Sequence, residues 1–287
     1  MGYEQWPVTL LTIITYSAAL RSLVKSSPCC LSVDNASKIV SFSHSLTISA
    51  AALYTLNAGG WALPGAQEQE AIRREQLNRL GGQGNYALLD DSQNIIINGR
   101  SRLAKGLLAW EAGYLFYDTI ILFVQSRQKH RNPGLLYLVR LTISESADVF
   151  VHHVLIFFGL ASLPIYFSKR RELGTWVFTS FLLMNASTPL LHTRTWFRRR
   201  YGKQSEALEL SFILLFAASR FGLVYWVIKK YAYYHDLETW DAFKRLYFVC
   251  RAGSSALVGF NAIWWSILLK RFLRRMISPV QKQGKGS

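Results

Sequence analysis

Two carboxylates on one predicted helical face are the first candidates for chemistry. The apolar segment "WEAGYLFYD" contains Glu111 and Asp118, with Tyr114 between them. Residues at i, i+3 and i+7 share one face of a helix, so these three side chains are expected to point the same way. Burial makes a charged carboxylate costly, and a buried carboxylic acid that keeps its proton can act as a general acid.

A second group lies in the segment "ADVFVHHVLIFFG". Asp148 and His152 continue a stripe that begins at Glu145, whereas His153 lies about 100° further round the helix and is expected to point at a neighbouring helix or along a cavity rim. Imidazoles accept and relay protons near neutral pH, so the two histidines are candidate bases. We therefore predict the following catalytic residues: Glu111, Asp118, Asp148, His152 and His153.

Other polar and aromatic side chains interrupt the apolar segments and are predicted to bind substrate. They are His44, Trp110, Tyr114, Asn185, His192 and Arg220. An ionisable side chain inside a membrane span costs roughly 2.5 to 3.5 kcal/mol, so it normally faces the interior of a helical bundle. Each residue also has a simpler interpretation as a helix-packing group, and Arg220 is expected to pair with Glu209, Glu111 or Asp118. Polar stripes on three neighbouring spans together favour a shared wet cavity.

The elements that must position these side chains are membrane-spanning helices. The chain has 287 residues, of which 51% are hydrophobic, and a formal net charge of +16. The basic residues lie between the apolar segments and do not form one face. This pattern favours a membrane protein with basic loops over a nucleic-acid-binding protein. Seven segments approach the roughly 20 residues that span a bilayer: 7–24, 38–63, 103–124, 148–168, 173–193, 207–228 and 246–269. The fold class predicted is an all-α integral membrane protein with about seven transmembrane helices.

The organisation predicted along the chain has three parts. Residues 1–37 form a first transmembrane helix and loop, residues 38–272 form the transmembrane domain with a surface loop at 64–102, and residues 273–287 form a basic tail. The distribution of Lys and Arg favours a cytoplasmic C-terminus. No cofactor motif or metal-ligand spacing is present, so neither a cofactor nor a metal is predicted. Membrane lipids are the expected partners, and the sequence leaves homo-oligomerisation open.

Four segments together resemble the TLC-domain family of multi-pass endomembrane proteins. They are, in order, "IVSFSHSLTIS", "WEAGYLFYD", "VHHVLIFFG" and "MNASTPLLHTRTWF", and the resemblance covers roughly residues 38 to 272. It implies a TLC-like bundle, with six core helices around a lipid-accessible cavity, in the endoplasmic reticulum or related membranes. Family members include ceramide synthases, cargo receptors and proteins that modulate membrane lipid composition.

The resemblance to the ceramide synthases is partial. Their His-His pair is matched by His152 and His153, but the acidic cluster that they carry in the following span is not matched, because "NASTPLLH" contains no carboxylate. This departure counts against acyl transfer and leaves the fold prediction unchanged.

Three functional hypotheses follow. The first is an enzyme using acid/base chemistry on a long apolar lipid or isoprenoid, in its concrete version protonation-initiated terpene or meroterpenoid cyclisation. An acid would protonate an olefin or epoxide, aromatic rings would stabilise the carbocation by roughly 0.5 to 2 kcal/mol each, and a base would remove the last proton. The second is a ceramide-synthase-like N-acyltransferase that consumes an acyl-CoA. The third is a non-catalytic lipid-binding or cargo-handling protein.

Overall fold

The computed structural model describes residues 6–26, 32–63, 65, 91, 93–130, 134–145, 153 and 173–277. These residues form helices, with one isolated β-bridge between Ala62 and Arg100 and no strand among them. The all-α prediction is therefore confirmed. The chain divides into two compact units, Met1–Leu182 and Leu183–Ser287, and each is described by itself.

Five helical stretches in the described part of the chain are long and apolar enough to cross a membrane. They are Trp6–Lys25, Val33–Ala58, Arg102–Lys129, Glu206–Tyr234 and Phe248–Ile277. The exact count of seven is not confirmed: the predicted span 148–168 lies outside the described residues except for His153, and residues 175–201 are helical without forming one continuous α-helix.

The interruption in that stretch has a local cause. Helix α7 (Thr175–Phe181) passes into the 3-10 segment η2 (Leu182–Ser187), and α8 (Thr188–Tyr201) begins next to Pro189. Proline has no backbone N–H and clashes with the preceding turn, so a regular α-helix cannot run through this point. The α-helical spacing that put Asn185 and His192 on one face therefore does not hold across η2.

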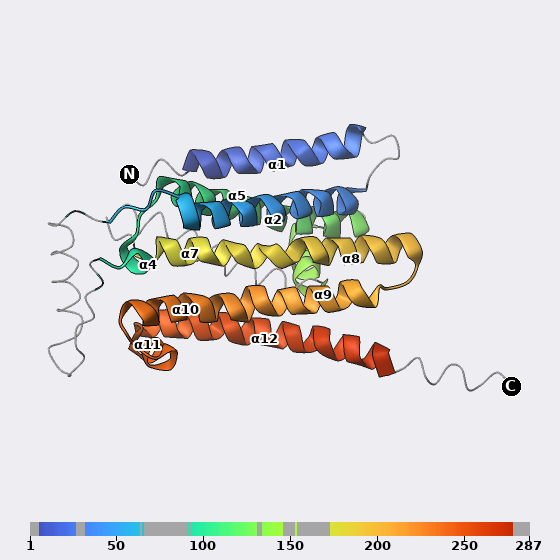
Figure 1. Cartoon of the computed structure of the whole chain (residues 1–287). Coiled ribbons are helices and arrows are strands. Elements are labelled where there is room, and N and C mark those ends of the chain that lie inside the picture. The colour runs from blue at the N-terminus through green and yellow to red at the C-terminus, as the bar shows by residue number, and fades with distance from the viewer. Residues whose placement is uncertain are drawn as a thin grey trace. The chain divides into compact units, whose positions relative to one another are not determined.

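In the first unit, α1 (Trp6–Ser26), α2 (Val33–Ala58) and α5 (Arg102–Lys129) pack against one another (Figure 1). Helix α7 packs against α2, α5 and the short α4 (Ile95–Asn98). The last part of the predicted surface loop, 64–102, therefore packs against the bundle. Asn94, Asn98 and Ser101 in this part are buried.

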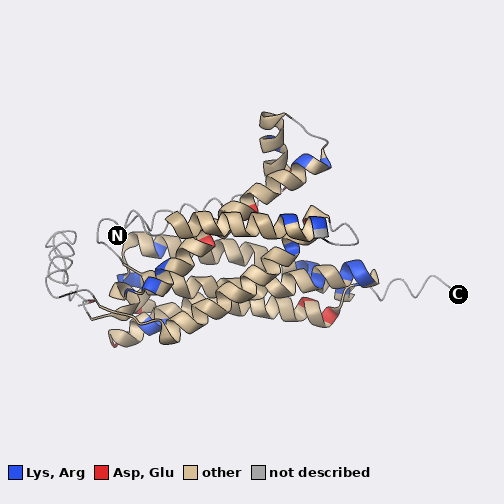
Figure 2. Ribbon diagram, turned by 90° about the horizontal axis from the view of Figure 1, so that it is seen from above, with Lys and Arg blue, Asp and Glu red and all other residues tan. Residues whose placement is uncertain are grey.

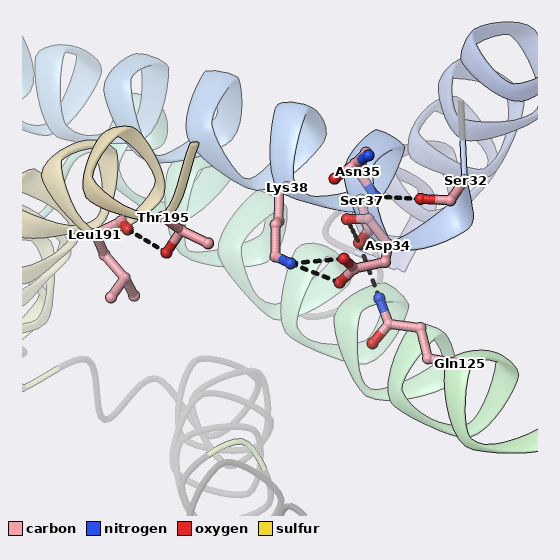
Figure 3. Close-up of polar contacts among 8 residues, drawn as sticks. All are labelled: Ser32, Asp34, Asn35, Ser37, Lys38, Gln125, Leu191 and Thr195. Atoms are coloured by element: carbon pink, nitrogen blue, oxygen red, sulfur yellow. Dashed lines mark hydrogen bonds and ion pairs between the residues drawn. The ribbon is translucent and has the colours of Figure 1, made fainter. Parts of the chain in front are cut away.

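Side-chain caps and bridges define how α2 begins and where it meets α5 (Figure 3). The Ser32 hydroxyl accepts a hydrogen bond in the first turn, and the Lys38 ammonium lies 2.7 Å from both oxygens of Asp34. The Gln125 amide on α5 donates to the Ser37 hydroxyl at 3.0 Å. Serine capping recurs at Ser101 for α5, so polar residues fix the starts of helices whose bodies are apolar.

The second unit consists of η2 from Leu183 onward, α8, α9 (Glu206–Ala217), the π-helical segment η3 (Ala218–Gly222), α10 (Leu223–Tyr234), α11 (Thr239–Arg245) and α12 (Phe248–Ile277). Helix α9 packs against α8 and α12, and η3 also contacts α12. Most of the helical ribbon is neither acidic nor basic, and blue basic segments gather near helix ends (Figure 2). That distribution suits helices whose middles lie in hydrocarbon.

Close packing between α1 and α5 depends on small residues. A Cβ atom at Gly113 would lie 2.7 Å from the Thr9 carbonyl oxygen and 2.8 Å from Thr12 Cβ, so only glycine allows this approach. Ala109 precedes Gly113 by one turn, and its carbonyl accepts a hydrogen bond from the Thr9 hydroxyl at 3.1 Å. Small residues four apart let the backbones of membrane helices approach closely, as here.

Replacing Gly113 with alanine is expected to force α1 away from α5. The free energy of unfolding should fall by about 1 to 3 kcal/mol, the usual cost of an extra methyl in a packed interface. Thermal unfolding of the purified protein in detergent micelles measures this effect. Gly106→Ala is the matched control, because a Cβ there meets open space on the same helix. Equal stability of the two variants would show that α1 is not held at Gly113.

Candidate functional site

A buried histidine on α2 is the centre of a hydrogen-bonded network in the first unit. His44 is 1% exposed, and its Nε2 lies 2.9 Å from the Glu111 Oε2 of α5. On its other side, Nδ1 lies 2.7 Å from the hydroxyl of Tyr16 on α1. The Trp110 indole N–H donates to that hydroxyl at 2.9 Å. Tyr16, His44, Trp110 and Glu111 are called the His44 network below.

The network has a preferred direction. An indole nitrogen can only donate, so the Tyr16 oxygen accepts from Trp110. The Tyr16 hydroxyl hydrogen then finds its acceptor at His44 Nδ1, and the His44 hydrogen sits on Nε2 and points at the Glu111 carboxylate. In the opposite arrangement the Tyr16 hydrogen would have no acceptor among the described contacts. The hydrogen bonds therefore run from Trp110 through Tyr16 and His44 to Glu111.

Aromatic rings enclose the imidazole of His44. The Tyr114 ring stacks on it with centroids 3.6 Å apart and planes at 12°, and the Tyr16 and Trp110 rings approach edge-on at 5.5 and 5.8 Å. Stacked and edge-on ring contacts are favourable in buried clusters, so these rings help to hold the imidazole in place. Trp110 and Tyr114, predicted to bind substrate, thus contact His44.

A second carboxylate–imidazole pair lies further along α5. His153 Nε2 is 3.4 Å from the Asp118 Oδ2, and His153 is 7% exposed. The Asp118 side chain is 24% exposed, against 8% for Glu111, so it is the more accessible of the two acids. Seven helical residues rise about 10 Å, so Glu111 and Asp118 are separated by about that distance along the helix axis. These residues are called the Asp118–His153 pair below.

The structure brings together six of the predicted site residues. His44, Trp110, Glu111, Tyr114, Asp118 and His153 all lie in the first unit. His153 contacts Asp118 of α5, whereas Asp148 and His152 lie outside the described residues, so the predicted offset between them stays a prediction.

Three other predicted residues belong to the second unit. Asn185 lies in η2, and the His192 ring lies 6.2 Å from that of Trp196 in α8. The Arg220 guanidinium lies in η3 over the Phe216 ring, 5.2 Å from its centre.

Two acids predicted near the site have basic partners elsewhere. Glu209, one of the acids expected to pair with Arg220, has Arg194 at 2.9 Å and Arg275 at 3.6 Å. Glu145, predicted to begin the polar stripe, lies near the surface and accepts hydrogen bonds from Lys129 and His130, which lower its pKa. A carboxyl held in its charged form is a poor general acid, so Glu145 does not extend the site.

Tyr16 is the network member that sequence reasoning missed. A tyrosine in an apolar segment is usually a packing residue of a membrane helix, and its partner His44 is 28 residues away in the sequence. The available signal was the spacing of Thr9, Thr12 and Tyr16 at i, i+3 and i+7, which places three hydroxyls on one face of α1. That face is the one packed on α5 at Gly113.

The described carboxylates and imidazoles can take part in proton transfer. Among them, no group of three or more His, Cys, Asp or Glu side chains is arranged to hold a metal ion. Two carboxylates of α5, each paired with an imidazole from elsewhere in the first unit, can accept, hold and return protons.

The comparison with protein families gives one match. The model of the TLC domain matches residues 34–270, most of the chain. No curated protein and no solved structure matches the chain. The matched region contains every described site residue except Tyr16, which lies before it on α1.

Removing the Tyr16 hydroxyl tests the His44 network. In Tyr16→Phe, the Trp110 N–H loses its acceptor and His44 Nδ1 loses its donor, and each unsatisfied buried group costs about 1 to 3 kcal/mol. The melting temperature in micelles should fall accordingly. Tyr54→Phe is the control, because Tyr54 is 62% exposed on α2 and its change should stay within about 0.5 kcal/mol. A Tyr16→Phe variant as stable as Tyr54→Phe would contradict the network.

Proposed function

Because the chain belongs to the TLC-domain family, whose model matches residues 34–270, we propose that this multi-pass membrane protein is an enzyme that moves protons on a long apolar lipid or isoprenoid. The observation that carries the proposal is the buried Glu111 carboxylate, held 2.9 Å from His44 within a membrane span. Family membership also supports an endoplasmic-reticulum or other endomembrane location.

The two carboxylates suit different roles in this proposal. Asp118 is the accessible acid, and His153 at 3.4 Å can return a proton to it after each turnover. Glu111 accepts a hydrogen bond from His44, and in this proposal it acts as the base. In this proposal, the spacing of about 10 Å lets the acid and the base act at opposite ends of a folded substrate segment.

The concrete reaction proposed is cyclisation of an isoprenoid chain. The Asp118 carboxyl gives its proton to an olefin or an epoxide oxygen, and the π electrons of neighbouring double bonds then form carbon–carbon bonds. The final carbocation loses a proton to the Glu111 carboxylate, and product and substrate have the same mass. Asp118 regains a proton through His153, and Glu111 releases its proton to solvent, so that no net proton is consumed. The protein supplies the acid and the base, and aromatic side chains near them can stabilise a carbocation.

Lipid extracts from a microbial host that makes isoprenoids test this proposal. Cells with the wild-type chain should accumulate a lipid isomeric with its precursor. Asp118→Asn and Glu111→Gln should each reduce that lipid about 100-fold or more, the usual loss when a general acid or base is removed. Mass spectrometry with chromatography resolves the isomers.

Asp34→Asn is the matched control for Asp118→Asn. It makes the same chemical change in a surface ion pair with Lys38, and it should leave the product level unchanged. Membrane insertion and melting temperature of each variant establish that loss of product is not loss of fold. An unchanged lipid profile in wild-type cells would favour the lipid-binding or cargo-handling alternative, and full activity of Asp118→Asn would rule out its role as the acid.

A second candidate function, N-acyl transfer of the ceramide-synthase type, is favoured by one observation. The fifth predicted span lacks the acidic cluster, but Asp118 of α5 provides a carboxylate for the second histidine of the His-His pair at 3.4 Å. A carboxylate that orients an imidazole makes it a better general base for attack by an amine on an acyl thioester.

Membranes incubated with labelled long-chain acyl-CoA and a sphingoid base test this second candidate. Acyl transfer predicts a labelled amide, lost about 100-fold or more in His153→Ala because the general base is gone. His130→Ala is the control, since His130 lies outside the site and contacts Glu145. Formation of a new lipid without any thioester would eliminate acyl transfer.

A further inference from the structure

Two buried polar atoms lie near the middle of α12, in the second unit. Asn261 is 2% exposed and occupies the fourteenth position of a helix of 30 residues. Its amide nitrogen donates to the Leu257 carbonyl at 2.7 Å, which fixes the orientation of the amide. The Asn261 Oδ1 therefore faces away from its own helix backbone, and it has no hydrogen-bond partner among the described residues.

The second polar atom is the indole nitrogen of Trp265, one helical turn further along. It is buried and likewise has no hydrogen-bond partner in the described part of the chain. The Trp265 ring meets the Phe221 ring edge-on at 6.2 Å, which places this face of α12 against η3. Residues at i and i+4 share a face, so the Asn261 acceptor and the Trp265 donor lie on the same face of α12.

The surroundings make these two groups unusual. The hydrocarbon core of a bilayer supplies no water, so polar groups at this depth normally find partners within the protein. They lie beside a π-helical segment, and π-bulges in α-helices occur frequently at functional sites. On the other side of α12, Ile263 and Ile267 are exposed, so the helix borders lipid.

We propose that Asn261 and Trp265 bind the hydroxyl group of a lipid alcohol. A hydroxyl donates its hydrogen to the Asn261 Oδ1, and its oxygen accepts from the Trp265 N–H, so one group satisfies both atoms. An ether or ester oxygen cannot donate, an ammonium cannot accept, and an ionised carboxylate would repel the Asn261 oxygen. This site shares no residue with the proton-transfer site and does not depend on the proposed reaction.

Photo-crosslinking of the full-length chain in lipid nanodiscs tests the site. The probe is a 16-carbon alcohol carrying a diazirine, and its methyl ether is the matched control probe. The alcohol should label peptides of residues 248–277, and unlabelled alcohol should compete for the site. The ether should label them about tenfold less, because it cannot donate to Asn261.

Two variants locate the hydroxyl. Trp265→Phe replaces the indole by a smaller aromatic ring without an N–H, and Asn261→Leu removes the acceptor at similar size. Each should reduce labelling by the alcohol about tenfold. Trp264→Phe is the control, because it makes the same substitution one position before Trp265. The Trp264 ring packs on Phe260, and this variant should keep wild-type labelling.

Equal labelling by the alcohol and the ether in the wild-type chain would overturn the proposal even if both variants fail to fold. That result would mean that a buried water molecule satisfies the two atoms. Labelling by the alcohol that survives in correctly folded Trp265→Phe and Asn261→Leu would overturn it as well.

Discussion

The structure of the first unit depends on the burial of one carboxylate inside a membrane span. Glu111 has an 8% exposed side chain, and a bare charge at that depth would cost several kcal/mol. The imidazole of His44 offsets this cost, which requires α2 to place His44 against α5 at this height. His44 in turn has a second nitrogen to satisfy, and Tyr16 of α1 supplies the hydroxyl. One buried acid thus fixes the relative positions of three helices.

Helix α1 is an integral part of this arrangement although it precedes the TLC-domain match. The match begins at residue 34, whereas α1 ends at Ser26. The absence of a side chain at Gly113 lets α1 approach α5, and the same face of α1 carries Tyr16 to His44. Close packing of backbones and completion of the polar network are therefore two consequences of one helix–helix contact. We infer that α1 positions the His44 network.

Spacing within one helix could be predicted from the sequence, and contacts between helices could not. The shared face of Glu111 and Asp118 and the all-α membrane fold follow from periodicity and apolar length, which are local properties. The pairing of His44 with Glu111 spans 67 residues, and no local pattern encodes it. The break before Pro189 was missed because hydropathy is insensitive to whether a helix is α or 3-10. The sequence therefore indicated which side chains share a helix face, but not which side chains of other helices they contact.

The central claim is that Glu111 is an unprotonated base at the end of a directed chain of hydrogen bonds. Nitrogen-15 NMR of histidine-labelled protein in nanodiscs tests it directly, with the His44 signals assigned by their loss in His44→Gln. The account predicts that His44 carries its hydrogen on Nε2 and leaves Nδ1 bare, because Tyr16 donates to Nδ1 and His44 donates to Glu111. A hydrogen found on Nδ1 alone would mean that Glu111 holds the proton, and would contradict its role as the base.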